Sequence, residues 1–404
     1  MSDQVLTRLK NIVSVHNGAT PKSDNPEFWD GDIAWATPVD LSTLKSKYLH
    51  STQRKITNLG YHSCNTKLVE PGNIVISNRA PIGLVAINKI PVCTNQGCKV
   101  LILNKYKVDV AYLYYYLLSI ADDLQNLGTG TTFMEISSET LKNITIPVVP
   151  LPRQKDIAEW LDKKTATIDK MIAAKNRTRT HLAELRTAII SELIFGAKGL
   201  EDGSNQLYRH LISQQSGTWG LEPNGFNEVK CLRVADFDYD KLTHVEPETI
   251  RSIDSNHMAT KLLRHGDILI EKSGGGEKAP VGRAIIVNEL NGLTSYANFV
   301  DRLRFKKTVL PRYALYVLYA MYSGGINTKH IKQNTGIQNL DIKHYLKETV
   351  PIPSIQDQLS IIKHAQVRLS KLDAAADLLN KTILQLKEYR TSLISNVITG
   401  KVEV

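Results

Sequence analysis

Residues 176–196, NRTRTHLAELRTAIISELIFG, decide the architecture of this 404-residue chain, because a closely related pattern, NKTILQLKEYRTSLISNVITG, returns at residues 380–400. The match extends back without a gap to Gln154 and Gln358, at a constant offset of 204 positions. Thirteen of the 43 aligned pairs are identical, and ten of these fall in the last 21 positions. A repeat of roughly 200 residues is too long for a solenoid. It predicts a duplicated module and internal two-fold pseudo-symmetry.

Both repeated stretches are predicted to be long helices. Proline-rich segments precede them, at residues 146–152 and 350–353, and neither stretch contains another proline or glycine before Gly196 or Gly400. Proline suits the first turn of a helix, and glycine commonly follows its last turn. Residues at seven-residue steps are mostly apolar, as in a coiled coil: Leu161, Ile168, Lys175, Leu182 and Ile189, matched by Ala365, Leu372, Leu379, Leu386 and Leu393. Met171, Leu185, Ala375 and Tyr389 partly fill a second predicted stripe.

We expect the two helices to pack against each other, and an antiparallel arrangement is natural for one chain with a large module between them. The alternative is that each helix packs only on its own domain. The apolar seams favour the pair, because each seam needs a long partner.

The sequences in front of the helices share a β-rich skeleton. PGNIVIS at residues 71–77 corresponds to HGDILIE at residues 265–271, and each reads as a turn followed by a buried strand. Tyrosine-rich helical runs follow at residues 112–120 and 313–322. The predicted fold class is α+β, with two globular domains, residues 1–150 and 201–350, joined and separated by two long antiparallel coiled-coil helices within residues 151–200 and 351–404.

Composition and charge place the chain among soluble globular proteins with a modest preference for polyanions. The chain is 42% hydrophobic and 22% charged, with a net charge of +10 that is spread over both halves. No apolar run approaches the ~20 residues needed to span a bilayer, and the N-terminus lacks the apolar core of a signal peptide. We therefore expect a cytoplasmic protein.

Known catalytic and metal-binding motifs are missing from the sequence. It contains no [Asp/Asn/Ser]-Pro-Pro-[Tyr/Phe] loop of a DNA amino-methyltransferase, no HExxH, and no CxxC among its four cysteines. The glycines at 274–276 lack the spacing of a phosphate-binding loop, and Glu271 is not followed by the E-x-K of a nuclease core. We expect no catalytic residue, no metal and no cofactor in this chain.

Two variable modules, each followed by a repeated helix, resemble the specificity subunit of Type I restriction–modification systems. The resemblance rests on the proline-rich entry into each helix through Gln154 and Gln358, and on the helix ends LRTAIIS at 185–191 and YRTSLIS at 389–395. The GTGTT loop at 128–132 and the PGNI turn at 71–74 are similar to that family's target-recognition domains. The likeness covers essentially the whole chain.

The resemblance implies a division of labour. Each recognition domain would read one half of a split, asymmetric DNA sequence, and the helices would set the spacing and dock two modification subunits. Those subunits resemble adenine methyltransferases that use S-adenosylmethionine, and restriction subunits driven by ATP and Mg²⁺ would join through them. An enzyme fusion and a coiled-coil protein-interaction scaffold without specific DNA readout remain as alternatives.

Candidate DNA-binding residues follow from side-chain chemistry in the variable loops. Asn and Gln suit adenine, Arg and Lys suit guanine, and hydroxyl groups suit either bases or phosphates. A solvated loop role is an equally good interpretation for any one of them. The candidates in residues 1–150 are Ser77, Asn78, Arg79, Asn95, Gln96, Thr129, Thr131 and Thr132. Those in residues 201–350 are Lys272, Ser273, Lys278, Tyr296, Asn298, Lys329, Lys332, Gln333, Asn334 and Gln338.

Polar residues that recur near the helix ends form a second group of candidates. Their recurrence predicts a shared contact, either between the helices or with the partner subunits, although an arginine near a helix C-terminus can simply favour the helix dipole. These residues are Glu184, Arg186, Thr187 and Ser191, matched by Glu388, Arg390, Thr391 and Ser395.

Overall fold

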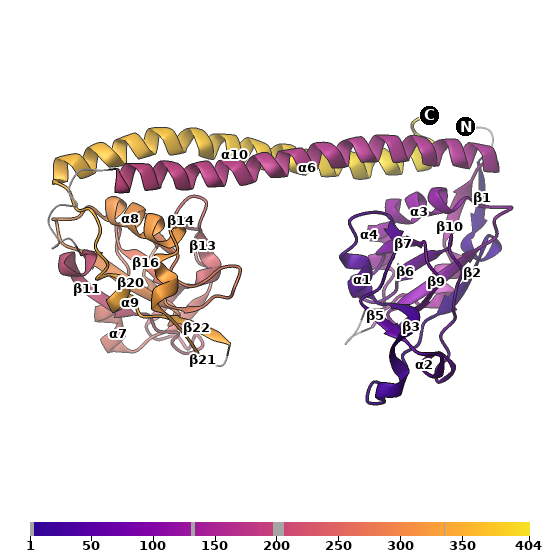
Figure 1. The fold of residues 1–404 in the computed structure, drawn as a ribbon, viewed down its shortest axis with the longest axis horizontal. Helices are drawn as coiled ribbons and strands as arrows, with labels where there is room; N and C mark the ends of the chain where they lie inside the picture. Colours follow the sequence, from indigo (N-terminus) through magenta and orange to yellow (C-terminus); the bar gives the residue numbers. More distant parts are fainter. Residues whose placement is uncertain (1–3, 131–133, 197–205, 335) are drawn as a thin grey trace. The chain divides into compact units, whose positions relative to one another are not determined.

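The computed structural model describes residues 4–130, 134–196, 206–334 and 336–404 (Figure 1). By its internal contacts the chain divides into two compact units: unit 1 is Met1–Ala174 with Thr382–Val404, and unit 2 is Lys175–Lys381. Each unit thus holds one predicted module and one end of each long helix. The predicted boundaries at 150, 200 and 350 treat the helices as segments of their own, and they remain a prediction.

Unit 1 is built on a five-stranded sheet with a smaller sheet beside it. The main sheet is antiparallel except for one parallel pair, β4 with β7, and the smaller sheet contains the parallel pair β3 with β8. The main order is β2 (Val13–Asn17), β9 (Cys98–Leu103), β6 (Ile74–Ser77), β7 (Val85–Asn88), β4 (Tyr48–Leu49), and the smaller order is β5 (Arg54–Ile56), β3 (Trp29–Ala36), β8 (Val92–Thr94). The remaining elements are β1 (Val5–Arg8) paired with β10 (Thr145–Val148), α1 (Pro38–Ser42), α2 (Asn58–His62), α3 (Val110–Ser119), α4 (Ala121–Asn126) and α5 (Ser138–Asn143).

Unit 2 repeats this plan, except that its main sheet has four strands and no counterpart of β4. Its main sheet runs β11 (Leu211–Ser216), β20 (Val300–Phe305), β16 (Ile268–Glu271), β18 (Ala284–Ile286), and its smaller sheet runs β15 (Ile250–Ser252), β12 (Glu228–Leu232), β19 (Thr294–Tyr296). A further sheet runs β17 (Ser273–Gly274), β22 (Ile337–Leu340), β21 (Ile331–Asn334), and β13 (Phe237–Asp238) pairs with β14 (Thr243–His244). The helices are α7 (Ser255–Thr260), α8 (Pro311–Ser323) and α9 (Ile342–Tyr345).

The central strands β6 and β16 explain why each module is stable. Every residue of both strands is buried, and alternate side chains enter different hydrophobic clusters. Ile74 and Ile76 join the cluster that contains α3, whereas Val75 joins a second cluster on the other face. Because successive side chains of a strand point to opposite faces, these strands are covered on both sides. The turn before each strand places a glycine at positive φ, +87° at Gly72 and +85° at Gly266, which other residues rarely adopt.

The two predicted long helices are confirmed as α6 (Leu151–Phe195) and α10 (Ile355–Ile398). In unit 1, α3 lies along the ends of both helices (Figure 1), and one hydrophobic cluster joins them, which includes Leu161, Ile168 and Leu393. In unit 2, α8 shares a second cluster with Ile189 and Ala365. The helices therefore pack on the modules as well as on each other.

The predicted second stripe of the helices is wrong. Three of its four residues, Met171, Leu185 and Tyr389, are 46%, 47% and 57% exposed, and only Ala375 is half-buried. In the middle part of α6, between Ile168 and Ile189, no residue is buried. Heptad spacing thus identified the main seam, but the modules, rather than a second helix–helix stripe, cover the other apolar side chains at the helix ends.

Candidate nucleic-acid interface

The candidate DNA-binding residues of the first module gather where β6 ends. Asn78 and Arg79 follow β6 directly, and Gln96 lies in the turn between β8 and β9. Thr129 pairs with Glu135 through two backbone hydrogen bonds of 3.0 Å, and Glu135 also lies beside Arg79. Thr131 and Thr132 lie outside the described residues.

Only some of these side chains face solvent. Ser77 and Asn78 are fully buried, whereas Gln96 and Thr129 are exposed and Asn95 is half-buried. The Ser77 hydroxyl donates to the Pro81 carbonyl at 2.6 Å and accepts from the Leu84 amide at 2.9 Å. Ser77 and Asn78 therefore hold the neighbouring loops by hydrogen bonds inside the module, and they are not free to reach a base edge in this conformation.

A carboxylate connects the exposed and buried members of this group. Glu135 Oε2 accepts from Arg79 Nε at 2.9 Å, and Glu135 Oε1 accepts from Asn78 Nδ2 at 2.8 Å. Lys99 Nζ lies 3.9 Å from Glu135 Oε1 and donates to Asn17 Oδ1 at 2.8 Å. Burial lowers the pKa of Lys99, and the nearby Glu135 opposes this shift. Sequence reasoning did not find Glu135, because its type and position in the loop carry no distinctive signal.

The candidate DNA-binding residues of the second module also include both buried and exposed side chains. Ser273, Tyr296 and Gln338 are buried, and each bonds within the module: the Tyr296 hydroxyl, for example, donates to the Gln215 carbonyl at 3.1 Å. Lys272 is half-buried and donates to Ser216 Oγ at 2.8 Å, with Asp301 Oδ1 at 3.5 Å. The exposed candidates are Lys278, Asn298, Lys329, Lys332 and Gln333. Asn334 belongs to β21, and its side chain lies outside the described part of the structure.

The two modules place different side chains on one shared framework. The Ile136 amide bonds to the Asn78 carbonyl in the first module, and the Leu340 amide bonds to the Lys272 carbonyl in the second. This correspondence makes Asn339 the counterpart of Glu135 and Ser273 the counterpart of Arg79. Ser273 Oγ indeed donates to Asn339 Oδ1 at 2.6 Å. The same backbone position thus carries a guanidinium–carboxylate pair in one module and a hydroxyl–amide pair in the other.

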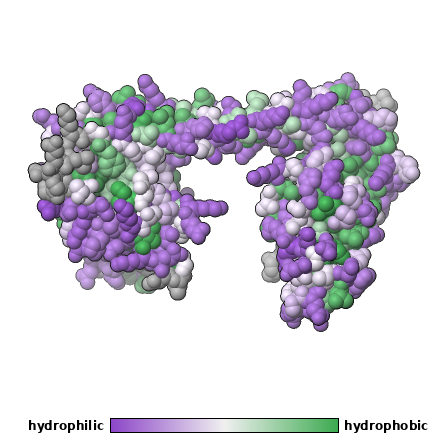
Figure 2. Space-filling model, viewed as in Figure 1, coloured by the Kyte–Doolittle hydropathy of each residue, from purple (hydrophilic) through white to green (hydrophobic). Residues whose placement is uncertain are grey.

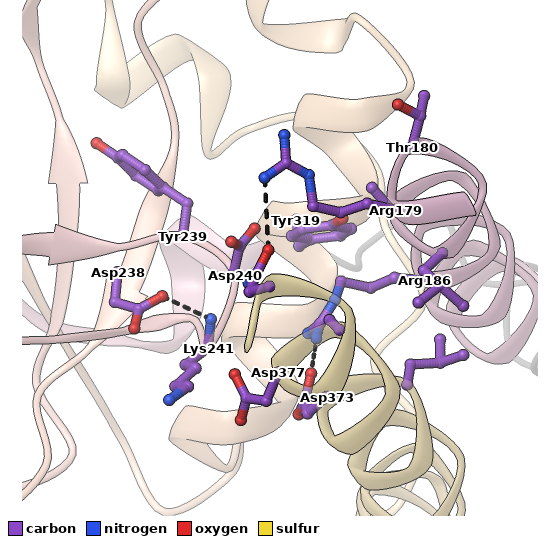
Figure 3. Close-up of a pocket in the computed structure, with 15 residues that line it drawn as sticks. Arg179, Thr180, Arg186, Asp238, Tyr239, Asp240, Lys241, Tyr319, Asp373 and Asp377 are labelled. Atoms are coloured by element: carbon purple, nitrogen blue, oxygen red, sulfur yellow. Dashed lines mark hydrogen bonds and ion pairs between the residues drawn. The ribbon is translucent and has the colours of Figure 1, made fainter. Parts of the chain in front are cut away.

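Two of the recurring polar residues of the helices make contacts between the helices. In unit 2, Arg186 of α6 forms an ion pair with Asp373 of α10 (Figure 3). In unit 1, Arg390 of α10 donates to Asp169 of α6 at 2.9 Å and 3.2 Å. The residue numbers of each pair add up to 559, so the helices are antiparallel with one register in both units. Asp169 and Asp373 are identical at the repeat offset, a signal that could have identified them.

The other recurring residues do not form a common cluster. Thr187 Oγ1 lies 3.1 Å from the Tyr319 hydroxyl, whereas Thr391 donates to Lys387 of its own helix at 3.2 Å. Glu184 is exposed beside His181, Glu388 is exposed, and Ser191 and Ser395 are half-buried. Their matching positions leave Glu184 and Glu388 on the open surface of the helices.

The two modules are attached to the helices differently. In unit 1, Asp162 of α6 accepts hydrogen bonds of 2.6 Å from Lys47 Nζ and from the Tyr115 hydroxyl. Burial and the Asp162 carboxylate raise the pKa of Tyr115, so its hydroxyl remains a donor. The repeat offset places Gln366, which is exposed, at the equivalent position of α10. Unit 2 therefore lacks this ion pair.

Unit 1 contains an open cavity of about 590 Å³ beside Lys47, Asp162 and Arg390, and unit 2 contains the equivalent cavity between the 238–241 loop and the long helices. The unit 2 cavity has a volume of about 570 Å³, and Figure 3 shows Arg179, Arg186, Lys241, Asp240 and Asp377 around it. Cations and carboxylates line it together, which does not suit a polyanion such as DNA. Elsewhere, hydrophilic residues dominate most of the surface visible in Figure 2, with hydrophobic residues in small groups.

Among the described residues, no group of three or more His, Cys, Asp or Glu side chains is arranged to hold a metal ion. No helix in the described ranges combines the length and the apolar character needed to cross a bilayer.

Several known proteins that are similar to this chain are Type I specificity subunits. The family model described as Type I restriction modification DNA specificity domain matches residues 1–177. The Type I restriction enzyme MjaIX specificity subunit of Methanocaldococcus jannaschii is 37% identical over 161 residues, which is 39% of this chain and 37% of that protein. The MjaVIII specificity subunit of the same organism is 22% identical over 100% of this chain and 93% of its own length.

A solved structure shares the fold over almost the whole chain. It comes from work on complex assembly and conformational transition of the type I R-M system, with a TM-score of 0.69, 16% identity and 98% coverage of both chains. The α+β fold with two long helices is confirmed by this likeness. Residues 1–177 thus match the Type I specificity domain, and over its whole length the chain resembles Type I specificity subunits, as its repeated sequence indicates.

Proposed function

We propose that this chain reads a bipartite, asymmetric DNA target in a Type I restriction–modification complex, with one half-site for each recognition module. The two half-sites differ in sequence, and the base pairs between them are not read. Because DNA is its ligand, the chain acts in the cytoplasm.

The observation that carries this proposal is the shared framework with exchanged side chains. At one backbone position the first module carries the partly exposed Arg79 with Glu135, and the second carries the buried Ser273, which bonds to the exposed Asn339. A duplicated scaffold that only bound proteins would have no need to vary hydrogen-bonding groups on an otherwise constant loop pair. A protein that recognises two different half-sites needs this variation, because bases are distinguished by the donors and acceptors at their edges.

The long helices are proposed to set the spacer and to dock two modification subunits. Exposed apolar side chains lie on the helices of each unit: Met171, Leu384 and Tyr389 in unit 1, and Leu185, Leu359 and Val367 in unit 2. Apolar side chains that remain exposed along a helix suit burial by another protein. One such group in each unit suits two copies of one partner, and restriction subunits would join through those partners.

Chemistry is assigned to the partners rather than to this chain. The modification subunits would bind S-adenosylmethionine and methylate adenine after flipping it from the duplex. The restriction subunits would bind ATP and Mg²⁺. This chain would supply the sequence readout and hold its partners at the two half-sites.

Modified-base sequencing tests the proposal. DNA is sequenced from cells that express a Type I modification-subunit gene with this chain, without it, and with a chain truncated after the first module. We expect a bipartite adenine-methylated motif only with the full chain. An active methyltransferase that produces the same methylation pattern with and without this chain would reject the proposal and favour a scaffold.

A further inference from the structure

We propose that Arg79 reads a guanine in the half-site of the first module and that Glu135 is the positioning residue that orients it. This inference deepens the proposed function and rests on it. It assigns a base to one module and a role to a carboxylate that the sequence did not single out.

The geometry of Arg79 is the first argument. Its side chain is 41% exposed, and its Nε is fixed by Glu135 Oε2 at 2.9 Å. Among the described residues, no hydrogen bond uses either terminal nitrogen of Arg79. A guanidinium has five N–H donors in a planar fork, and engaging Nε leaves four of them on the two terminal nitrogens. Those donors match the O6 and N7 acceptors that guanine presents in the major groove.

The rigidity of Glu135 is the second argument. Its backbone exchanges two hydrogen bonds with Thr129, and the next residue, Ile136, donates to the Asn78 carbonyl at 2.9 Å. Its second carboxylate oxygen accepts from Asn78 Nδ2, and Asn78 is fully buried. The carboxylate is therefore attached to the core of the module rather than to a free surface chain. An arginine held by such a group loses less conformational freedom when it binds.

Charge distinguishes a base contact from a phosphate contact. A phosphate-binding arginine gains nothing from an adjacent carboxylate, because the carboxylate repels the phosphate. At a base edge the same carboxylate is acceptable, since the cytosine paired with guanine presents an amino donor in the major groove. The Arg79–Glu135 pair therefore favours readout of a G·C pair over backbone binding.

The second module provides an internal comparison. Its counterpart pair is Ser273 and Asn339, with Oγ and Oδ1 2.6 Å apart, and it contains no guanidinium. Changes at Arg79 or Glu135 should therefore alter one position of one half-site and leave the other half-site unchanged.

The test measures base preference in the assembled complex of this chain with its modification subunits. Arg79→Lys keeps the charge and removes the planar fork, Glu135→Gln keeps the shape and removes the charge, and Arg8→Lys is the matched control. Arg8 is an exposed arginine of the same module that donates to Asn143 at 3.2 Å. Motifs are determined by modified-base sequencing, and affinities by competition with duplexes substituted one base pair at a time.

We expect Arg79→Lys to lower the preference for guanine at one position by about tenfold or more. Glu135→Gln should weaken the preference at the same position while non-specific binding stays equal or becomes stronger, because a negative charge is lost. A purely structural role for Glu135 would instead weaken both kinds of binding. Arg8→Lys should change neither.

The outcomes separate this inference from the function it rests on. If the wild-type complex yields no bipartite motif, the proposed function fails. If it yields a bipartite motif but neither half-site requires a G·C pair, or Arg79→Lys leaves every position unchanged, the assignment of Arg79 is wrong. If the Glu135→Gln variant has the same base preference as the wild type, Glu135 has no positioning role.

Discussion

Gln154 and Gln358 show how one buried side chain joins a module to its helix. Both are fully buried in the first turn of a long helix. Gln154 accepts from the Asp109 amide at 2.8 Å and donates to the carbonyls of Lys107 and Val149 at 3.0 and 2.8 Å. Gln358 makes the same three bonds, to the Leu310 amide and the carbonyls of Thr308 and Pro353. The identity of this glutamine in both repeats thus has a structural cause.

Replacing Gln154 by alanine should destabilise the protein by about 2–4 kcal/mol, because it leaves buried backbone groups without partners. The measurement is the midpoint of urea unfolding, followed by circular dichroism. Gln125→Ala, at an exposed position of the same unit, is the control and should shift the midpoint little. A Gln154→Ala variant as stable as the control would mean that water replaces the lost bonds.

The cysteines give a second prediction at this scale. Cys93, Cys98 and Cys231 are fully buried, and burial raises the pKa of Cys93 to about 12. Cys64 is only half-buried, although burial raises its thiol pKa as well. At pH 8 a thiol reagent should therefore label Cys64 first, and the other three only when the protein unfolds, since thiolates react and buried thiols remain protonated. Cys64→Ser should abolish the fast phase; a fast phase that persists would contradict this order.

Residue chemistry predicted where polar loops occur but not which side chains face outward. Ser77, Asn78, Ser273, Tyr296 and Gln338 have suitable groups for DNA, yet all five are buried. A loop that approaches DNA needs its own internal hydrogen bonds, and the same residue types supply them. Only the three-dimensional structure separates the two roles.

At the scale of elements, the long helices were predicted more accurately than the modules that pack against them. Proline before and glycine after an uninterrupted stretch set both ends to within a few residues. The pairing register, in contrast, depends on Asp169 with Arg390 and Arg186 with Asp373, which are distant in sequence. The smaller sheets contain short strands, some of them parallel, whose partners no local pattern specifies.

Equivalent isoleucines at the helix ends should stabilise their own units. Ile190 is 1% exposed in the unit 2 cluster, and Ile394 is 2% exposed in the unit 1 cluster. Alanine at either position should cost about 2–5 kcal/mol, whereas Leu384→Ala, at a 57% exposed site, should cost less than about 0.5 kcal/mol. Hydrogen exchange should show that Ile394→Ala lowers amide protection mainly in β9 and Ile190→Ala mainly in β20. Equal loss in both strands would show that the two units unfold together.

At the scale of the whole molecule, duplication would allow one chain to read the two different half-sites that we propose. Each unit has its own hydrophobic cluster, its own anchoring glutamine and its own variable loop pair. Side chains at the loops can therefore change without disturbing the helix contacts. The ion pair of Lys47 with Asp162 in unit 1, where unit 2 has Gln366 in place of the carboxylate, shows that the two copies have also diverged where they meet the helices.

The isolated chain should bind DNA weakly, with little sequence preference, and the complex with modification subunits should bind its target tightly. A net charge of +10 spread over 404 residues supports only non-specific affinity, typically in the micromolar range or weaker at physiological salt. Specific protein–DNA complexes usually have dissociation constants of about 10⁻⁸ M or lower, and we expect such affinity only when the partner subunits also contact the duplex.

Titrations with target and scrambled duplexes across a salt series measure the specific and the non-specific affinity. Binding of the isolated chain should weaken steeply as salt rises, because phosphate contacts release counterions. Nanomolar selection of one bipartite sequence by the isolated chain would instead mean that the two modules suffice for recognition, and that the partners add chemistry alone.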